Sequence, residues 1–390
     1  MDTITHGITG ALIGKAFFAE WQGPAPDGAG DGRVATFAAT LGAIFPDSDV
    51  IAELFSKNNL ATLELHRGFT HSFVCLPLFA LALAGLTCWF ARRREIRCPD
   101  WTRLALIYAT GLAVHIVLDL LTSFGTMIWS PLSNARAAWD LTFIIDFLFT
   151  GIVLLPQATA WVYRRRERHR RRGLLVWVFF SLCAVGIERL ARATGVPFSP
   201  WVVLVASLVM AALFFLPAWG GWGFGVRRAS WCRAGVYALA AYLGLSATAH
   251  QVALHRVEKF AATQELTVER MGALPMPPSP AYWSGLIRTP DGVWQSWFSL
   301  LERQPPAFRF FGDSPPNGYT EAVKQLPEVR TYLWFARFPV VRYSQRGDRN
   351  VVELTDRRFV AWRSRRTSAF TFRVTIDSAG RVLDQGWVED

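Results

Sequence analysis

Cysteine is scarce in this chain and shows no pattern of pairing. No two cysteines form a CxxC pair, and none lies beyond Cys232. Disulfide scaffolds and thiolate zinc sites both need cysteines at short, regular spacings. The sequence therefore indicates neither kind of site. The five cysteines are Cys75, Cys88, Cys98, Cys183 and Cys232.

We expect no cleavable signal peptide, and the carboxyl-terminal part of the sequence contains no histidine. Asp2 stands where a signal peptide has basic residues, and the first apolar run leads to no clear cleavage site. The chain has seven histidines, and none follows His255. The carboxyl-terminal part also lacks a compact carboxylate cluster, so we expect no catalysis within it.

Apolar residues dominate the rest of the composition. The 390 residues are 52% hydrophobic, with 17 Trp and 29 Phe, and the mean hydropathy is positive. This is too apolar for an ordinary soluble domain. The apolar runs end near residue 250, and mixed, aromatic sequence follows. We therefore predict a mainly α-helical polytopic transmembrane bundle over residues 1–250. An exit helix and Pro-rich linker over 251–280 should lead to a small β-rich (α+β) extramembrane domain over 281–390.

Several segments approach the roughly 20 apolar residues that cross a bilayer. Two shorter runs near the amino terminus predict tilted or re-entrant helices instead. The short runs are Ile8–Phe18 and Val34–Phe45, and the longer ones are Ser72–Ala91, Leu104–Leu121, Thr142–Tyr163, Leu174–Ala193, Trp201–Trp219 and, less extended, Ala234–Ala249.

The net charge of +11 comes largely from arginines between the apolar segments. An arginine-rich run follows every second long segment, as the positive-inside rule predicts for cytoplasmic loops. These runs are Arg92–Arg94, Arg164–Arg172 and Arg227–Arg228. We therefore expect a multi-pass protein of the bacterial inner membrane whose partner is the lipid bilayer, with the carboxyl-terminal domain outside the cytoplasm. We expect no nucleic-acid binding, because orientation explains the arginines better.

The carboxyl-terminal part predicts an antiparallel fold. The turns Pro290–Gly292 and Asp377–Gly380 should close hairpins, and Leu274–Pro280 should form a stiff linker. The strands are expected at Thr331–Phe338, Val351–Leu354, Phe359–Trp362 and Ala369–Ile376.

Four polar patches interrupt the apolar first third of the chain. They are Thr5-His6, Asp47–Asp49, His66–His71 and His115 with Asp119. Ionisable groups are costly at membrane depth unless they pair, line a wet cavity or hold an ion. Imidazole and carboxylate together suit zinc, manganese or iron. The patches therefore predict a metal site made by membrane helices.

Each patch alone has an ordinary structural explanation. His115 and Asp119 lie one helical turn apart, which suits either one shared ion or a buried pair between helices. His66 and His71 fit an interfacial loop, and Asp47 with Asp49 fits a solvated turn or a helix cap. The four patches together favour the metal site.

The same patches carry a family resemblance. The stretches MDTITHG (1–7), FPDSD (45–49), HRGFTHS (66–72) and HIVLDLLTSFGT (115–126) resemble the bacterial membrane-bound metal-dependent hydrolase family of the YdjM type. The chain is more weakly similar to zinc-dependent phospholipase C and P1-type nucleases, which would suggest phosphoester substrates. The resemblance implies that the ligands, or residues that orient them, are His6, Asp47, Asp49, His66, His71, His115 and Asp119, with Asp140 and Asp146 as further candidates.

A hydrolase of this type would use one or two divalent ions, and zinc is the expected metal, with manganese or iron as alternatives. Asp49 would act as the base, and Arg67 would clamp an oxyanion or phosphate. An arginine at this depth commonly contacts lipid headgroups instead. The substrate would be an ester or phosphoester, including a lipid-linked one, at the outer face of the membrane. The alternative is a metal-binding transport, sensing or scaffold protein without catalysis.

Overall fold

The computed structural model describes residues 1–19, 32–56, 60–96, 99–193, 199–360 and 370–388. Cys98 and part of the predicted strand Phe359–Trp362 lie outside these residues. The chain divides into two compact units, and each is described by itself. The first unit comprises Met1–Pro46, Phe73–Leu118 and Ile145–Gly244. The second comprises Asp47–Ser72, Asp119–Ile144 and Leu245–Asp390.

Helices account for most of the described chain, which confirms the predicted mainly α class. Some short stretches are not α-helical, among them a π-helix at Gly14–Phe18 and 3-10 helices at Phe45–Ser48 and Phe69–His71. The α-helices up to the end of the apolar region are α1 (Thr3–Ile13), α2 (Arg33–Ile44), α3 (Asp49–Leu54), α4 (Ala61–Glu64), α5 (Leu76–Arg93), α6 (Trp101–Leu120), α7 (Phe147–Val162), α8 (His169–Ala193), α9 (Pro200–Trp219) and α10 (Arg228–Thr263).

Five helical segments of the described chain are long and apolar enough to cross a membrane. They confirm the transmembrane prediction and four of the six longer segments. The predicted short run Val34–Phe45 lies within Arg33–Leu54, which is itself long enough to cross. Thr142–Tyr163 is shortened, because the Asp146 side chain accepts the N–H groups of Leu148 and Phe149 and caps α7 there. Ala234–Ala249 lies inside the 36-residue α10, which is not among the five. The five segments are Arg33–Leu54, Leu76–Arg93, Trp101–Leu120, Arg166–Ala193 and Pro200–Trp219.

Small residues allow α1, α2 and α6 to pack closely in the first unit. A Cβ atom at Gly10 of α1 would lie 2.6 Å from the carbonyl oxygen of Ala39 on α2, and one at Gly111 of α6 would lie 2.6 Å from the same oxygen. Neither position has room for a side chain. Such close approach is typical of membrane helices. It holds together the helices that carry His6 and His115.

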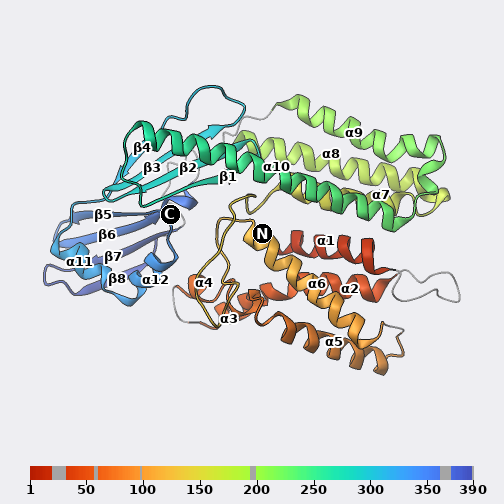
Figure 1. Cartoon of the computed structure of the whole chain (residues 1–390), viewed down its shortest axis with the longest axis horizontal. Helices are drawn as coiled ribbons and strands as arrows, with labels where there is room; N and C mark the ends of the chain where they lie inside the picture. The colour runs from red at the N-terminus through yellow and green to blue at the C-terminus, as the bar shows by residue number, and fades with distance from the viewer. Residues whose placement is uncertain (20–31, 57–59, 97–98, 194–198, 361–369, 389–390) are drawn as a thin grey trace. The chain divides into compact units, whose positions relative to one another are not determined.

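The second unit contains two four-stranded antiparallel sheets with the orders β1-β2-β3-β4 and β5-β6-β7-β8. Figure 1 shows α11 (Gly318–Lys324) and α12 (Pro327–Phe335) beside the second sheet, and buried side chains of both helices join its core. The strands are β1 (Arg270–Met276), β2 (Tyr282–Thr289), β3 (Gly292–Ser299), β4 (Arg309–Gly312), β5 (Pro339–Arg346), β6 (Arg349–Asp356), β7 (Thr371–Ile376) and β8 (Val382–Trp387).

Both predicted hairpin turns are confirmed, between β2 and β3 and between β7 and β8. The predicted strand Thr331–Phe338 is wrong, because most of it belongs to α12. The buried residues Val329, Tyr332 and Phe335 recur every third position, which is a helical period.

The predicted linker Leu274–Pro280 is also wrong in its first part, because Leu274–Met276 ends β1. Pro275 is tolerated there since β1 is an edge strand and pairs only with β2. Phe359, the first residue of the predicted strand Phe359–Trp362, is instead the last residue of a 3-10 helix.

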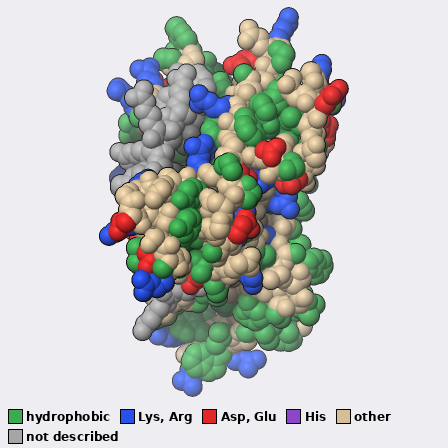
Figure 2. Space-filling model, turned by 90° about the vertical axis from the view of Figure 1, so that its left-hand side faces the viewer, with side chains coloured by type: hydrophobic (Ala, Val, Ile, Leu, Met, Phe, Trp, Pro, Cys, Tyr) green, Lys and Arg blue, Asp and Glu red, His purple; other side chains and the backbone are tan. Residues whose placement is uncertain are grey.

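Charged side chains of both signs are scattered over the face that carries sheet β5–β8. Figure 2 shows Asp and Glu interspersed with Lys and Arg, with hydrophobic side chains between them. Mixed charges of this kind are typical of a surface that faces water.

Candidate metal centre

Two carboxylates follow the point where α2 ends. Proline cannot donate the hydrogen bond that would continue an α-helix, and at Phe45–Ser48 the chain winds into a 3-10 helix that contains Pro46. Asp47 lies in this turn, and Asp49 is the first residue of α3. Asp49 is buried and Asp47 is half-buried, so neither is a fully solvated turn residue.

His71 lies beside both Asp47 and Asp119 within the second unit. Its Nε2 atom is 3.2 Å from Oδ2 of Asp119 and 3.6 Å from Oδ1 of Asp47. The three residues offer ligand atoms that lie within 4.8 Å of one another. His71 and Asp119 are completely buried. This set, with His115 one turn before Asp119 on α6, is the first ligand group.

His115 is fixed within the first unit by a hydrogen bond and a stacked ring. Its Nδ1 is 2.7 Å from the carbonyl oxygen of Ala43, which can only accept a proton, so Nδ1 is the protonated nitrogen. The lone pair then belongs to Nε2, as a metal ligand requires. The His6 ring stacks on His115 with centroids 3.7 Å apart. His6 belongs to neither ligand group of the described chain, so the structure places it against a candidate ligand.

A second ligand group lies wholly in the second unit. It consists of Asp49, Glu53 and His66, and Nδ1 of His66 is 3.3 Å from an oxygen of each carboxylate. Glu53 was not predicted as a ligand from the sequence. The signal was present, because Asp49 and Glu53 are spaced by one helical turn and therefore share a face of α3.

Asp49 lies between the two groups. Its Oδ1 faces His66, and its Oδ2 is 3.3 Å from Nδ1 of His71 and accepts the backbone N–H of Arg67. Nδ1 of His71 lies 3.0 Å from the hydroxyl of Thr70 as well as 3.3 Å from Asp49, and its Nε2 is directed to Asp47 and Asp119. A carboxylate behind a histidine is a common way to orient a metal ligand.

Arg67 is buried beneath this centre. Its Nη2 atom is 3.0 Å from Oδ1 of Asp119, and its Nη1 donates to the hydroxyl of Thr122 at 2.7 Å. The guanidinium also lies 5.2 Å from the ring centroid of Phe124. The backbone at Arg67 is left-handed, with φ of 58°, a conformation that costs a non-glycine residue about 1 kcal/mol or more. Strain of this kind is typical of functional sites. The oxyanion clamp stays a prediction, because both Nη atoms already contact protein groups.

Arg136 ties the His66–His71 loop to the rest of the second unit. It donates to the carbonyl oxygens of Leu63, His66 and Gly125. Burial is the main cause that lowers the pKa of Arg136 to about 9, and the positive charge of the nearby Arg67 lowers it further. The side chain remains a cation at neutral pH. The three carbonyls explain why it is retained in a buried position.

The two further candidates lie elsewhere. Both oxygens of Asp140 accept hydrogen bonds from the guanidinium of Arg337, at 2.9 and 2.7 Å. Asp146 caps α7 and accepts the hydroxyl of Tyr242 at 2.5 Å. Both carboxylates therefore have structural roles, and neither belongs to a ligand group of the described chain.

The donor set fits a divalent transition-metal ion. Imidazole nitrogen and carboxylate oxygen are ligands that zinc, manganese and iron share. Both groups mix the two donor types. Together they contain four carboxylates and three imidazoles, all buried or half-buried, and this excess of acidic groups calls for a compensating positive charge. The donors do not select one of these metals.

Comparisons with known proteins agree with this part of the chain. The family model described as YdjM inner membrane protein matches residues 1–195, half of the chain and all of the predicted ligands. The chain is also 31% identical over 152 residues to the uncharacterized protein YfhP of Bacillus subtilis (strain 168). That match covers 38% of this chain and 43% of YfhP, so the chain spans less than half of that relative. No solved structure matches. The weaker similarity to phospholipase C and P1-type nucleases has no support in these comparisons.

Proposed function

Because this chain belongs to the YdjM inner membrane protein family, we propose that it is a membrane-embedded metal-dependent hydrolase. Five helical segments that can span a bilayer fit a multi-pass inner membrane protein. The observation that carries the metal site of this proposal is His71, whose Nδ1 lies near Asp49 while its Nε2 faces Asp47 and Asp119. This is the arrangement of an oriented metal ligand.

A divalent ion held by the first ligand group would polarise a substrate oxygen and activate water for attack. The residues of the chain would supply orientation and proton transfer. Asp49 would keep Nδ1 of His71 protonated, and Arg67 would hold Asp119 through Oδ1 so that Oδ2 faces His71. Asp49, the base predicted from the sequence, would thus be occupied with His71. We therefore assign the proton of the attacking water to Asp47, whose side chain is the more exposed of the two.

The second ligand group supports a second ion. Asp49 belongs to this group and also contacts His71 of the first, so the two groups adjoin. Paired metal sites that share a carboxylate are common in hydrolases of phosphoesters. We propose two ions, with zinc as the expected metal and manganese or iron as alternatives. Hydrolysis of an ester or phosphoester would break the bond to the leaving group and add water across it.

Membrane placement suggests a substrate linked to lipid. Asp119 lies at the end of the candidate span Trp101–Leu120, where polar headgroups begin. The arginines Arg92–Arg94 follow α5, Arg164–Arg172 follow α7 and Arg227–Arg228 follow α9. The positive-inside rule places these ends in the cytoplasm and the opposite ends, with the candidate ligands, outside. The sheets would then lie outside the cytoplasm as well.

The alternative function is metal binding without catalysis, as in a transporter, sensor or scaffold. Such a protein would use the same ligands in a closed coordination sphere, whereas an enzyme needs an open position for substrate. The distinguishing experiment combines metal analysis of the purified full-length protein with a broad screen of esters, phosphomonoesters and phosphodiesters, including lipid-linked ones. Metal-dependent turnover that is lost in Asp47→Asn would support the hydrolase. Stoichiometric metal with no turnover on any class would favour the alternative.

A further inference from the structure

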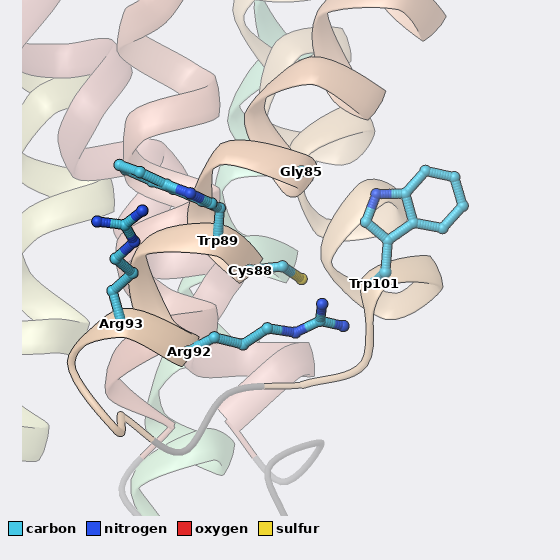
Figure 3. Close-up of a pocket in the computed structure, with 6 residues that line it drawn as sticks. All are labelled: Gly85, Cys88, Trp89, Arg92, Arg93 and Trp101. Carbon is cyan, nitrogen blue, oxygen red and sulfur yellow. The ribbon is translucent and has the colours of Figure 1, made fainter.

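The end of α5 carries a pocket that takes no part in the candidate metal centre. It has a volume of about 480 Å³ and lies where α5 ends and α6 begins. Figure 3 shows the Arg92 guanidinium between Cys88 and Trp101, and Arg93 alongside Trp89. The lining residues are Gly85, Cys88, Trp89, Arg92 and Arg93 of α5 and Trp101 of α6.

The charged side chains that line this pocket are Arg92 and Arg93. Arg93 lies over the Trp89 ring at 4.9 Å, and neither Arg92 nor Arg93 forms an ion pair with any residue that the structure describes. Asp100, the carboxylate before Trp101, is engaged by Arg103 at 3.1 Å. Two cations that share a concave site without an acidic partner favour an anionic ligand.

The surroundings of the pocket are those of a membrane interface. Both α5 and α6 are candidate spans, and the pocket lies at their ends. Trp89 and Trp101 are both about half exposed, and tryptophan at the end of a span commonly lies at the level of the headgroups. Leu86 is exposed one turn deeper on α5, where lipid acyl chains would lie.

We propose that this pocket binds the headgroup of an anionic phospholipid. The phosphodiester would accept hydrogen bonds from Arg92, since a guanidinium group can donate two parallel hydrogen bonds to two phosphate oxygens. Arg93 would add the second positive charge, and Trp89 and Trp101 would hold the glycerol region. The excess of positive charge selects lipids with net negative charge over phosphatidylcholine, whose phosphate is balanced by choline.

Gly85 allows the pocket to be filled without removing either arginine. A Cβ atom built there would meet no other atom within 4 Å, so Gly85→Leu places its side chain in open space. Gly186 of α8 is equally open and lies outside the pocket, so Gly186→Leu is the matched control. Arg170 and Arg171, exposed at the start of α8, provide a control for loss of charge.

The experiment measures lipid binding to the full-length protein in detergent by native mass spectrometry. We expect phosphatidylglycerol to bind more tightly than phosphatidylcholine. Gly85→Leu and the double variant R92Q/R93Q should each lower the affinity for the first bound phosphatidylglycerol molecule by at least tenfold. Gly186→Leu and R170Q/R171Q should leave it unchanged. Equal binding of the two lipids, or equal affinity in all variants, would overturn the proposal.

A second measurement reports on the pocket itself. Cys88 is half-buried in its wall, whereas Cys183 is exposed on α8. Phosphatidylglycerol should slow maleimide modification of Cys88 several-fold and leave Cys183 unaffected, and R92Q/R93Q should abolish this protection. Glycerol phosphate and inorganic phosphate lack acyl chains and should not protect Cys88. Protection by either at the same concentration as the lipid would identify a soluble phosphate as the ligand and overturn the lipid proposal.

Discussion

Arg67 Nη2 lies 3.0 Å from Asp119 Oδ1, and both side chains are almost completely buried. The other oxygen of Asp119 faces His71, so one carboxylate contacts a fixed cation and a candidate metal ligand. The positive charge of Arg67 also offsets the desolvation cost of burying the Asp119 carboxylate, since an unpaired carboxylate would be strongly disfavoured there. The pair is therefore the structural support of the first ligand group.

Replacement of Arg67 should affect both folding and metal binding. Arg67→Gln leaves Asp119 buried without its cation, which should lower the free energy of unfolding by about 3 kcal/mol. Metal affinity should fall by roughly 10- to 100-fold, as when other groups that orient ligands are removed. Thermal unfolding and metal titration of the purified protein measure the two effects.

Arg103→Gln is the control for this change, because Arg103 is exposed and pairs with Asp100 outside the centre. It should alter neither quantity. If Arg67→Gln leaves stability and metal affinity intact but lowers turnover, Arg67 contacts substrate and the clamp prediction is correct.

His115 and Asp119 should act together on one ion. Either His115→Ala or Asp119→Ala should remove most of the metal bound by the first ligand group. The double variant should lose little more, because ligands of one ion act as a unit. Elemental analysis per folded protein measures the loss.

His255→Ala is the control for histidine removal, because His255 is exposed on α10. Its metal content should match that of the wild type. Full metal content in both single variants at His115 and Asp119 would show that the pair only joins helices.

The location of the candidate ligands could be predicted from the sequence, because polar residues are conspicuous inside apolar helices. Asp47, His71 and Asp119 lie far apart along the chain, and the structure brings their ligand atoms within 4.8 Å. Their separate roles could not be predicted. The choice between ligand and orienting residue depends on which imidazole nitrogen faces Asp49, and only tertiary packing decides that.

The helices were also easier to predict than the strands. A membrane span is a long apolar run, whereas a short strand and an amphipathic helix can share one pattern over a few residues. Thr331–Phe338 shows this, since Tyr332, Trp334 and Phe338 are spaced as on one face of a strand, whereas Tyr332 and Phe335 are spaced as on one face of a helix. Pro327 at the start of α12 was the signal for a helix. Asp140 could not be separated from the ligands, because its partner Arg337 lies almost two hundred residues away.

Asp140 and Arg337 should contribute to stability and not to metal binding. Asp140→Asn and Arg337→Gln each break a pair whose carboxylate is buried, so each should lower the free energy of unfolding by roughly 2–3 kcal/mol. The double variant should be less destabilised than the sum of the two, as expected for partners in one interaction. A drop in metal content in Asp140→Asn, with none in Arg337→Gln, would make Asp140 a ligand.

The orientation of the carboxyl-terminal sheets can be tested with reporters at the end of the chain. We expect alkaline phosphatase fused after Asp390 to be active, because it folds only outside the cytoplasm, and green fluorescent protein fused there to remain dark. The same reporters placed after Arg168, between α7 and α8, should give the opposite result. Fluorescence at Asp390 with activity at Arg168 would reverse the orientation and place the candidate centre at the cytoplasmic face.

The number of ions can be decided at Glu53 and His66. These residues belong only to the second ligand group, whereas Asp49 also contacts His71 of the first. His66→Ala and Glu53→Gln should each reduce the metal content from two ions to one per chain, and Asp49→Asn should reduce both. Glu64→Gln is the matched control, because Glu64 lies nearby on α4, where its carboxylate accepts the hydroxyl of Thr331. One ion per chain in the wild type, unchanged in His66→Ala and Glu53→Gln, would show that the second group holds no metal and that His66 has only a structural role.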